Sequence, residues 1–369
     1  MPLQVIVSHL NETEKIRVMA GETIFSLGDI GFVMYFILAG EVNITIEDQL
    51  LDCLGAGQVF GEMALADNQV RSATATAVTD CILAAINKER FAALIQQQPA
   101  FATDVMAIMS ARLRRYMEEE LRRQRLEEEL AIGRQIQLSL LPDKCPALYG
   151  WEFAASYRAA RQVGGDLYDF IPDPANPDIL HLVIADVTGK GVPAALFMTM
   201  CRTIIRAAAL NGRSPANLLQ RTNQLLMSER RSLPFLTAFF ASLNTQTGQL
   251  VYALGGHDRP YWVQADGGHM QQLAGRGMVL GAFANVHLEE KSITLAPGDT
   301  LILYTDGITE ARHEQELFDE ARLEAVIAAS AHASAAQLAQ AILDAVAQFC
   351  GTSPQADDMT LVVVKRRPI

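Results

Sequence analysis

The chain has little that would tie it to a membrane, an oxidising compartment or a zinc site. Its five cysteines are scattered, with no C-x-x-C pair and no histidine at zinc spacing, so we expect reduced, mostly buried thiols. The N-terminal segment has no basic stretch followed by an apolar one. The longest apolar span, residues 194–210, is interrupted by Arg202 and Arg206. These absences predict a cytoplasmic protein that is neither secreted nor membrane-spanning.

Positive charge is also scarce. The 369 residues include 42 acidic and 30 basic side chains, which gives a formal net charge of −12. A chain of that sign has no overall attraction for phosphate backbones or anionic lipids, so we expect no nucleic-acid and no membrane partner. Half of the residues are hydrophobic. That length and apolar content predict more than one domain, each of roughly 100 to 200 residues.

Three regions differ in their sequence pattern. Residues 1–100 hold short alternating segments broken by glycines, which predicts a small β-barrel or sandwich, with a jelly-roll-like barrel as the expected form. Residues 101–141 have a helical pattern that Pro142 ends. In residues 142–369 strand-like and helix-like segments alternate, so we predict a multidomain α+β chain with a barrel, a helical linker and a second domain. The clearest strand candidates of the barrel are residues 16–25, 35–46 and 73–86.

The linker carries its charges in blocks. Residues 112–129 hold six arginines and six glutamates, so that opposite charges recur four positions apart, as in Glu118 and Arg122. Each such pair supports an exposed helix by roughly 0.2–0.5 kcal/mol. The apolar positions between them form an imperfect heptad seam. Two alternatives follow, a single solvated helix or a helix that pairs with its twin, and we expect the homodimer.

The first chemical signal lies in residues 60–77. A loop that holds a cyclic phosphate needs backbone donors, a cation for the phosphate and a carboxylate for a ribose hydroxyl. Gly61 permits a close backbone approach, and Glu62 is the available acceptor. Arg71 is the cation, and Ser72 adds a hydroxyl beside it. The segment therefore predicts an anion-binding loop.

This segment resembles the phosphate-binding cassette of cyclic-nucleotide-binding domains, and the glycine-punctuated residues before it resemble that family's barrel strands. The resemblance implies a regulatory cyclic nucleotide, cyclic AMP in preference to cyclic GMP, bound by Gly61, Glu62, Arg71 and Ser72. The alternative is a barrel that has lost its ligand and only dimerises, with Arg71 paired to a surface carboxylate. Members that act on DNA carry a helix-turn-helix after the barrel. The charged linker stands there instead, so we do not expect a transcription factor.

The second chemical signal is a set of aspartates in turn-like settings. They are Asp166, Asp186, Asp306 and Asp357, and three of them adjoin apolar, strand-like runs. Carboxylates at strand ends can converge in space, where they would repel one another unless cations lay between them. Hard divalent ions such as Mg²⁺ and Mn²⁺ suit all-oxygen ligands. Two such ions serve the hydrolysis of phosphate esters by an activated water.

The second domain as a whole is similar to the PPM-type serine/threonine phosphatases of the bacterial sporulation and stress-response group. The similarity rests on ELAIGRQIQLSLLP, VGGDLYDF, ADVTGKGVPAALFM, GDTLILYTDGITEAR and DDMTLVVV, in the family's order over residues 130–369. It implies an α-β-β-α sandwich with two Mn²⁺ or Mg²⁺ ions at one end of the sheets. The catalytic residues and metal ligands that it implies are Asp166, Asp186, the backbone carbonyl of Val187, Asp306 and Asp357. Whether Asp358 joins them stays open.

The chain departs from this family in two places. Residues 256–260 read Gly-His-Asp-Arg-Pro where members usually have Gly-His-Asn-Pro-Pro, and Asp319 stands where glycine is common. Both departures put substrate fit in question, and neither removes an implied metal ligand. His257 is either a proton donor to the leaving group or a structural hydrogen-bonding residue.

Together these signals predict a metal-dependent protein serine/threonine phosphatase that cyclic nucleotide regulates. The resemblance implies a phosphorylated protein substrate, an anti-sigma factor antagonist in a partner-switching pathway. Two alternatives stay open at this point. One is a catalytically silent module that senses the nucleotide and binds a partner, and the other is a constitutive phosphatase whose barrel only dimerises.

Overall fold

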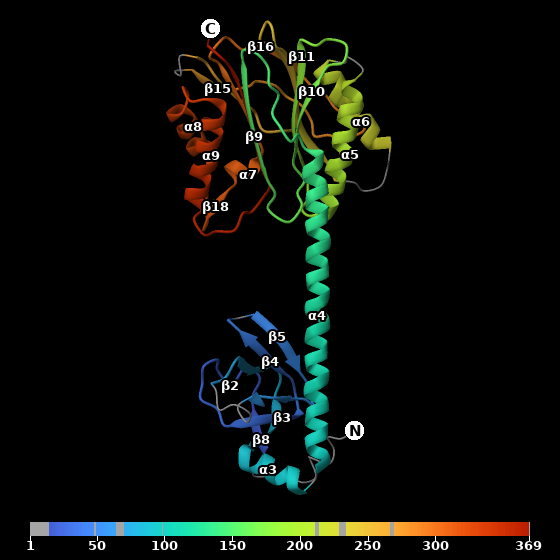
Figure 1. Cartoon of the computed structure of the whole chain (residues 1–369), viewed down its shortest axis with the longest axis vertical. Helices are drawn as coiled ribbons and strands as arrows, with labels where there is room; N and C mark the ends of the chain where they lie inside the picture. Colours follow the sequence, from blue (N-terminus) through green and yellow to red (C-terminus); the bar gives the residue numbers. More distant parts are fainter. Residues whose placement is uncertain are drawn as a thin grey trace. The chain divides into compact units, whose positions relative to one another are not determined.

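The computed structural model describes residues 15–47, 49–63, 70–97, 99–210, 214–228, 234–265 and 269–368. The chain divides into two compact units, Met1–Gln124 and Arg125–Ile369 (Figure 1).

The described part of the first unit is dominated by strands. They are β1 (Lys15–Val18), β2 (Thr23–Phe25), β3 (Val33–Ala39), β4 (Val42–Ile46), β5 (Gln49–Leu54), β6 (Val59–Phe60), β7 (Thr74–Ala77) and β8 (Cys81–Asn87). Two antiparallel four-stranded sheets result, in the orders β1-β8-β3-β6 and β2-β7-β4-β5. Ile37, Val42, Leu54 and Leu83 are fully buried in the core of this unit. The prediction of a small β-rich domain is confirmed.

Each of the three predicted strand segments is in fact a pair of strands. Gly21 separates β1 from β2 with φ 84°, and Gly40 separates β3 from β4 with φ 93°. Both lie in the left-handed region that glycine alone adopts freely, so the chain turns there. A Cβ at Gly40 would lie 2.6 Å from the carbonyl oxygen of Asp80, which leaves no room for a side chain. The predicted segments ran across these glycines, and the structure divides them there.

Helical structure begins earlier than residue 101. Helix α3 (Lys88–Gln97) precedes α4 (Pro99–Leu140), which ends just before Pro142 as predicted. Leu94 of α3 is buried against a small cluster that includes Phe36 of the barrel. The earlier start therefore follows from apolar contacts with β3, which helix spacing alone did not reveal.

The second unit holds two five-stranded antiparallel sheets between layers of helices. Its principal strands are β9 (Trp151–Arg158), β10 (Leu167–Pro172), β11 (Ile179–Val187), β12 (Leu236–Asn244), β13 (Gln249–Gly255), β14 (Tyr261–Val263), β15 (Met270–Gln272), β16 (Glu290–Thr294), β17 (Thr300–Tyr304) and β20 (Met359–Arg366). The sheet orders are β10-β11-β12-β13-β16 and β15-β14-β17-β20-β9. Two short strands, β18 (Arg312–His313) and β19 (Glu316–Leu317), form a separate hairpin.

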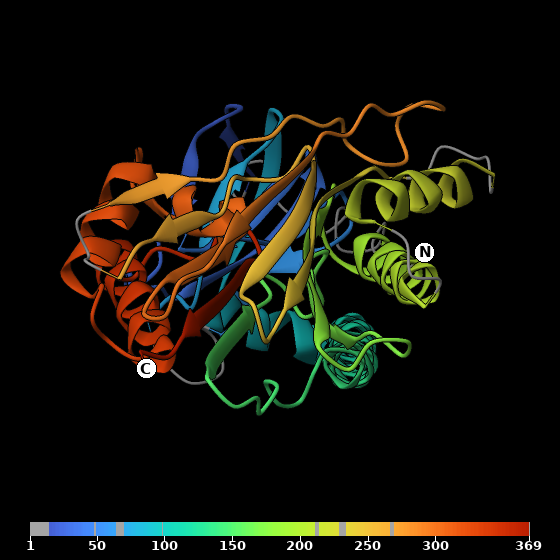
Figure 2. The same cartoon turned by 90° about the horizontal axis from the view of Figure 1, so that it is seen from above.

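The helices of this unit are α5 (Val192–Ala209), α6 (Pro215–Ser228), α7 (Asp306–Thr309), α8 (Asp319–Ala329) and α9 (Ala335–Cys350). Helices α5 and α6 lie on one side of the strands, and α8 and α9 lie on the other (Figures 1 and 2). The large core joins the sheets to α5 and α6, and a smaller one lies under α8 and α9. This is the α-β-β-α sandwich that the resemblance implied.

Helix α5 is the one helix among the described residues that is long and apolar enough to cross a membrane by length and composition. It packs in the core of the second unit, where Met198, Cys201 and Ile205 are buried. Arg202 and Arg206 both pair with the buried carboxylate of Asp169, at 3.0 and 2.7 Å. The apolar length of α5 is therefore accounted for by packing within the sandwich.

Candidate active site

The predicted aspartates lie at strand ends in both sheets. Asp166 directly precedes β10, and Leu167 of that strand pairs with Ala185 of β11, so Asp166 lies beside Asp186. In the other sheet, Tyr304 of β17 pairs with Leu361 of β20. Because β17 and β20 are antiparallel, Asp306 after the first and Asp357 before the second share one end of that sheet.

Asp166 joins the two sheets. It is 1% exposed, and its Oδ2 accepts hydrogen bonds from the hydroxyls of Thr305 at 2.8 Å and Thr360 at 2.6 Å. Burial, followed by the nearby charge of Asp186, holds the pKa of Asp166 well above its usual range, while the two threonine hydroxyls oppose that shift. The side chain of Asp166 is thus held by both sheets. Its negative charge is energetically unfavourable because it is buried beside another carboxylate.

Burial and nearby negative charges also disfavour the ionised forms of the neighbouring carboxylates. Burial raises the pKa of Asp186 to about 6, and the charges of Asp306 and Asp357 add to the increase. Burial also raises the pKa of Asp306, with Glu310 and Asp357 contributing. A set of carboxylates whose charges destabilise one another is a set that a divalent cation would stabilise.

Asp357 and Asp358 are adjacent in sequence and face different partners. Asp357 pairs with Lys190, with Oδ2 and Nζ 2.8 Å apart. Asp358 accepts hydrogen bonds from the backbone N–H groups of Ala160 at 2.7 Å and Gly165 at 2.5 Å. Both oxygens of Asp358 are therefore engaged in holding the backbone before β10. Asp357 has both oxygens engaged as well, because its Oδ1 accepts from the backbone N–H of Asp358 at 2.9 Å.

Glycines bring the backbone close to this cluster. A Cβ at Gly165 would lie 2.7 Å from the carbonyl oxygen of Val187, and one at Gly307 would lie 1.9 Å from that of Asp358. Only glycine permits these approaches. The predicted backbone ligand, the carbonyl of Val187, consequently lies against the segment that carries Asp166.

The donor set fits hard divalent ions because it consists of carboxylate oxygens and a backbone carbonyl. Within the described residues, no three Asp, Glu, His or Cys side chains are grouped closely enough to hold an ion as they stand. Lys190 pairs with Asp357, and the backbone N–H of Gly165 donates to Asp358. The structure therefore brings Asp166 beside Asp186 with Asp306 and Asp357 within electrostatic range, and the ligand assignment stays a prediction.

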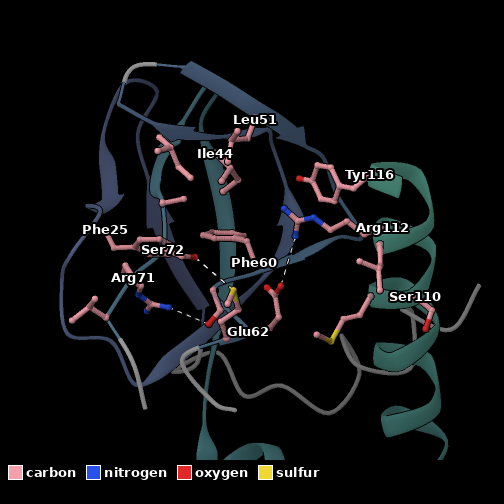
Figure 3. Close-up of a pocket in the computed structure, with 17 residues that line it drawn as sticks. Phe25, Ile44, Leu51, Phe60, Glu62, Arg71, Ser72, Ser110, Arg112 and Tyr116 are labelled. Atoms are coloured by element: carbon pink, nitrogen blue, oxygen red, sulfur yellow. Dashed lines mark hydrogen bonds and ion pairs between the residues drawn. The ribbon is translucent and has the colours of Figure 1, made fainter. Parts of the chain in front are cut away.

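The first unit contains a cavity of about 550 Å³, and all four residues predicted to contact a nucleotide line it. Gly61 and Glu62 follow β6, and Arg71 and Ser72 precede β7. Figure 3 shows Arg112 and Tyr116 projecting from α4, with Arg112 directed toward Glu62. The cavity is largely apolar, with Phe25, Ile44, Leu51 and Phe60 among its walls.

Arg71 is buried and is not paired with a surface carboxylate among the described residues. Its guanidinium donates to the carbonyls of Val33 at 2.7 Å and Gly61 at 3.1 Å and lies 4.0 Å above the ring of Phe25. Burial lowers its pKa. Glu62 lies 4.0 Å from the guanidinium of Arg112. The described contacts thus disfavour the alternative in which Arg71 serves only a surface ion pair.

Comparisons with known proteins match the two units of the chain to different families. Residues 176–367 match the stage II sporulation protein E (SpoIIE) family, which is more than half of the chain. The chain belongs to the SpoIIE family. Residues 15–98 match the cyclic nucleotide-binding domain.

The SpoIIE-family match extends to named relatives and to solved structures. The phosphoserine phosphatase RsbU of Bacillus subtilis is 29% identical over 66% of this chain and 72% of its own length. The SiaA-PP2C domain of Pseudomonas aeruginosa is 26% identical, with a TM-score of 0.59 over 66% of this chain and 98% of that domain. The second unit is thus a PP2C-type protein serine/threonine phosphatase domain, as the sequence predicted.

The first unit has relatives of its own. The cyclic AMP receptor protein of Thermus thermophilus is 38% identical over 26% of this chain. This chain covers 46% of that protein, less than half of its length. The SpoIIE-family phosphatase domain is therefore joined in one chain to a cyclic nucleotide-binding domain.

The departures from the family's sequence pattern have structural counterparts. His257 is buried, its Nδ1 lies 2.8 Å from the hydroxyl of Thr237, and burial lowers its pKa to about 4. A neutral imidazole is a poor proton donor to a leaving group, so the burial of His257 and its contact with Thr237 favour the structural alternative. Burial raises the pKa of Asp258 to about 6, with the charge of Asp306 second, so this residue adds a carboxylate near the acidic cluster.

Asp319 has φ 62°, in the left-handed region where glycine is common. Its carboxylate accepts a hydrogen bond from the backbone N–H of Arg322 at 2.9 Å and pairs with that guanidinium at 3.2 Å. Aspartate therefore keeps the turn at the start of α8, and this departure lies outside the acidic cluster.

Sequence reasoning missed three polar residues of the site. Thr305 and Thr360 bond to Asp166, and Lys190 pairs with Asp357. Each stands one to four residues from a predicted aspartate, in YTDG, DDMT and ADVTGK. Their closeness in sequence to the predicted aspartates could have drawn attention to these residues. The sequence could not show which aspartate each of them contacts.

Thr360→Val is expected to narrow the pH range of activity. The hydroxyl of Thr360 lowers the pKa of Asp166, so its removal raises that pKa further and favours the protonated acid, which is a poor cation ligand. A hydrogen bond to a charged group contributes roughly 1.5–3 kcal/mol, so activity should fall about tenfold at the acidic end of the profile and by less as pH rises. The measurement is a pH–rate profile, with Thr360→Ser as the matched control. An equal loss at every pH in Thr360→Val would contradict this role.

Proposed function

We propose that this chain is a metal-dependent protein serine/threonine phosphatase whose rate is set by cyclic nucleotide binding to its first domain. The observation that carries the proposal is the convergence of four strand ends around Asp166, which hydrogen bonds from Thr305 and Thr360 fix to the other sheet. The pKa values of Asp166, Asp186 and Asp306 are raised, so their negative charges are unfavourable there and bound cations would stabilise them.

Two Mn²⁺ or Mg²⁺ ions would be held by Asp166, Asp186, the carbonyl of Val187, Asp306 and Asp357. When bound, such ions supply activation of a water molecule and positive charge opposite the phosphoryl oxygens. Asp166 has the role of a fixed anchor, because its hydrogen bonds limit where its second oxygen points. Lys190 holds Asp357 at the edge of the cluster and is about two-fifths exposed, so it is available to an incoming phosphate.

For the first domain we propose cyclic AMP as the regulatory ligand. Gly61, Glu62, Arg71 and Ser72 all line the 550 Å³ cavity and supply the groups that a ribose and a cyclic phosphate need. The name of the Thermus thermophilus relative, a cyclic AMP receptor protein, favours cyclic AMP over cyclic GMP. Helix α4 lines the cavity and continues beyond the first unit, so it is the candidate route for the signal.

The proposed substrate is a phosphorylated protein, an anti-sigma factor antagonist in a partner-switching pathway of the cytoplasm. RsbU is named a phosphoserine phosphatase, which supports phosphoserine as the target. We also propose a homodimer through α4 and a division into residues 1–100, 101–141 and 142–369. The side chains of Leu113, Met117 and Leu121 on α4 are more than half exposed, which supports a helix partner.

The proposal is tested with p-nitrophenyl phosphate, cyclic AMP and the purified chain. We expect turnover that rises with Mn²⁺ and stops with EDTA, together with saturable cyclic AMP binding in a calorimeter. Nucleotide binding without turnover, also on a phosphoserine peptide, would favour the catalytically silent module. Turnover without nucleotide binding would favour the constitutive phosphatase.

A further inference from the structure

One basic side chain reaches across the candidate active site from one sheet to the other. Lys190 lies in the loop between β11 and α5, and its ammonium pairs with Asp357 Oδ2 at 2.8 Å, just before β20. The same Nζ donates to the carbonyl oxygen of Ala356 at 2.6 Å. Burial raises the pKa of Asp306, and the positive charge of Lys190 opposes that increase. Lys190 therefore neutralises part of the carboxylate cluster from the side of Asp357.

The two oxygens of Asp357 have different partners. Oδ1 accepts from the backbone N–H of Asp358 at 2.9 Å, whereas the partner of Oδ2 is the ammonium of Lys190. The side chain of Asp357 is 33% exposed, so a cation can approach it from solvent. Because two positive charges beside one carboxylate repel each other, a divalent ion that binds Asp357 competes with Lys190 for it.

The loop leaves Lys190 room to change partners. Gly189 and Gly191 flank it with φ 96° and 76°. No described heavy atom lies within 4 Å of the position that a Cβ would take at Gly189, and the side chain of Lys190 is 41% exposed. An ammonium on a flexible stem has three rotatable donors and binds phosphate as a point charge. Once released from Asp357, Lys190 is therefore a cation at the edge of the site that suits a phosphoryl oxygen.

We propose that Lys190 is a displaceable counter-ion: it neutralises Asp357 until a divalent ion takes that carboxylate, and it then binds the phosphoryl group of the substrate. This inference rests on the proposed function and adds to it an exchange of partners by one residue. Because the ion pair is partly exposed, its loss should change the affinity for ions by about fivefold. A hydrogen bond between charged groups contributes more, so its loss should weaken phosphate binding by about tenfold.

The test compares Lys190→Met with Lys291→Met in the full chain. Lys291 is the matched control, because it is 48% exposed on the edge strand β16 and its ammonium lies 3.8 Å from Glu289. Titration calorimetry with Mn²⁺ should show about fivefold tighter binding for Lys190→Met and no change for Lys291→Met. At saturating Mn²⁺, inhibition of p-nitrophenyl phosphate turnover by inorganic phosphate should weaken about tenfold in Lys190→Met alone. A residue that only holds its loop in place would not change the two affinities in opposite directions.

Chemical labelling follows the exchange directly in the unsubstituted chain. Acetic anhydride modifies lysine amines, and mass spectrometry of the resulting peptides gives the rate of acetylation at each position. We expect Lys190 to react faster in Mg²⁺ than in EDTA and Lys291 to react at the same rate in both. Equal rates at Lys190 would contradict its displacement from Asp357.

Unchanged or weaker Mn²⁺ binding in Lys190→Met, or unchanged inhibition by phosphate, would overturn the inference. Should Lys190→Met not fold, Lys190→Gln keeps N–H donors for the carbonyl of Ala356 and removes the charge, and the same results are expected of it. An unsubstituted chain that binds no Mn²⁺ would instead refute the proposed function, so the two failures are distinguishable.

Discussion

Asp186→Asn is expected to remove metal-dependent hydrolysis by roughly a thousandfold, about 4 kcal/mol of transition-state stabilisation. Asp186 lies beside Asp166 and within the electrostatic influence of Asp306 and Asp357, so it is at the centre of the predicted ligand set. Asparagine has the same shape and lacks the negative charge that a divalent ion requires. The measurement is turnover of p-nitrophenyl phosphate across a range of Mn²⁺ concentrations.

The same substitution should not destabilise the metal-free fold. The raised pKa of Asp186, about 6, means that the folded chain binds a proton more tightly than the unfolded chain does. That group's contribution to stability is therefore present at low pH and is lost as pH rises through about 6, so its ionised form is unfavourable at pH 8. We expect an unchanged or higher melting temperature for Asp186→Asn at pH 8 with EDTA.

Asp178→Asn is the matched control, because Asp178 precedes the other end of β11. Its carboxylate bonds to the exposed side chain of Gln246 at 3.3 Å, and we expect unchanged activity. Equal losses in both variants would point to a general effect on the strand. Retention of turnover in Asp186→Asn would remove that aspartate from the proposed mechanism.

Arg71→Leu is expected to weaken cyclic AMP binding by at least about a hundredfold and to abolish any response of the phosphatase to the nucleotide. Arg71 is a buried cation that lines the same cavity as Glu62 and Ser72. A charge-assisted, bidentate contact to a phosphate is roughly twice as strong as a neutral hydrogen bond. Leucine keeps part of the packing on Phe25 and removes the charge.

Basal hydrolysis should survive in Arg71→Leu, because the acidic cluster lies in the other unit. Arg17→Leu is the matched control, since Arg17 is exposed on β1 and does not line the cavity. Binding by calorimetry and turnover by phosphate release are measured on the same preparations. Unaltered nucleotide affinity in Arg71→Leu would contradict the assignment of this cavity as the nucleotide site.

Local patterns in the sequence predicted much of the fold and of the candidate site. Apolar strand-like runs that end in an aspartate, as before Asp186 and Asp306, predicted strand ends, and the structure has β11 and β17 there. The separation of a β-rich unit from a second unit of alternating strands and helices followed from where the periodicity changes near α4, whereas the α-β-β-α sandwich was implied by the family resemblance. These features depend on neighbours in sequence, which a single chain displays.

The parts that sequence did not reveal depend on contacts between distant residues. Asp358 bonds to Ala160 and Gly165, which lie 198 and 193 positions away, and this is why its role stayed open. The bond from Thr360 to Asp166 spans 194 positions. In the sequence, Gln137 is one more polar position of an exposed helix; its hydrogen bond to the carbonyl oxygen of Gly164 is visible only in the structure.

The most direct test of the central claim measures phosphate release from a phosphoserine peptide by the full chain at saturating Mn²⁺ while cyclic AMP is titrated. The account predicts that the rate changes, in either direction, by about fivefold or more, with a midpoint at the nucleotide concentration that half-saturates binding. It would be contradicted by metal-dependent hydrolysis that stays constant, with cyclic AMP and with cyclic GMP, while calorimetry shows the first domain filled.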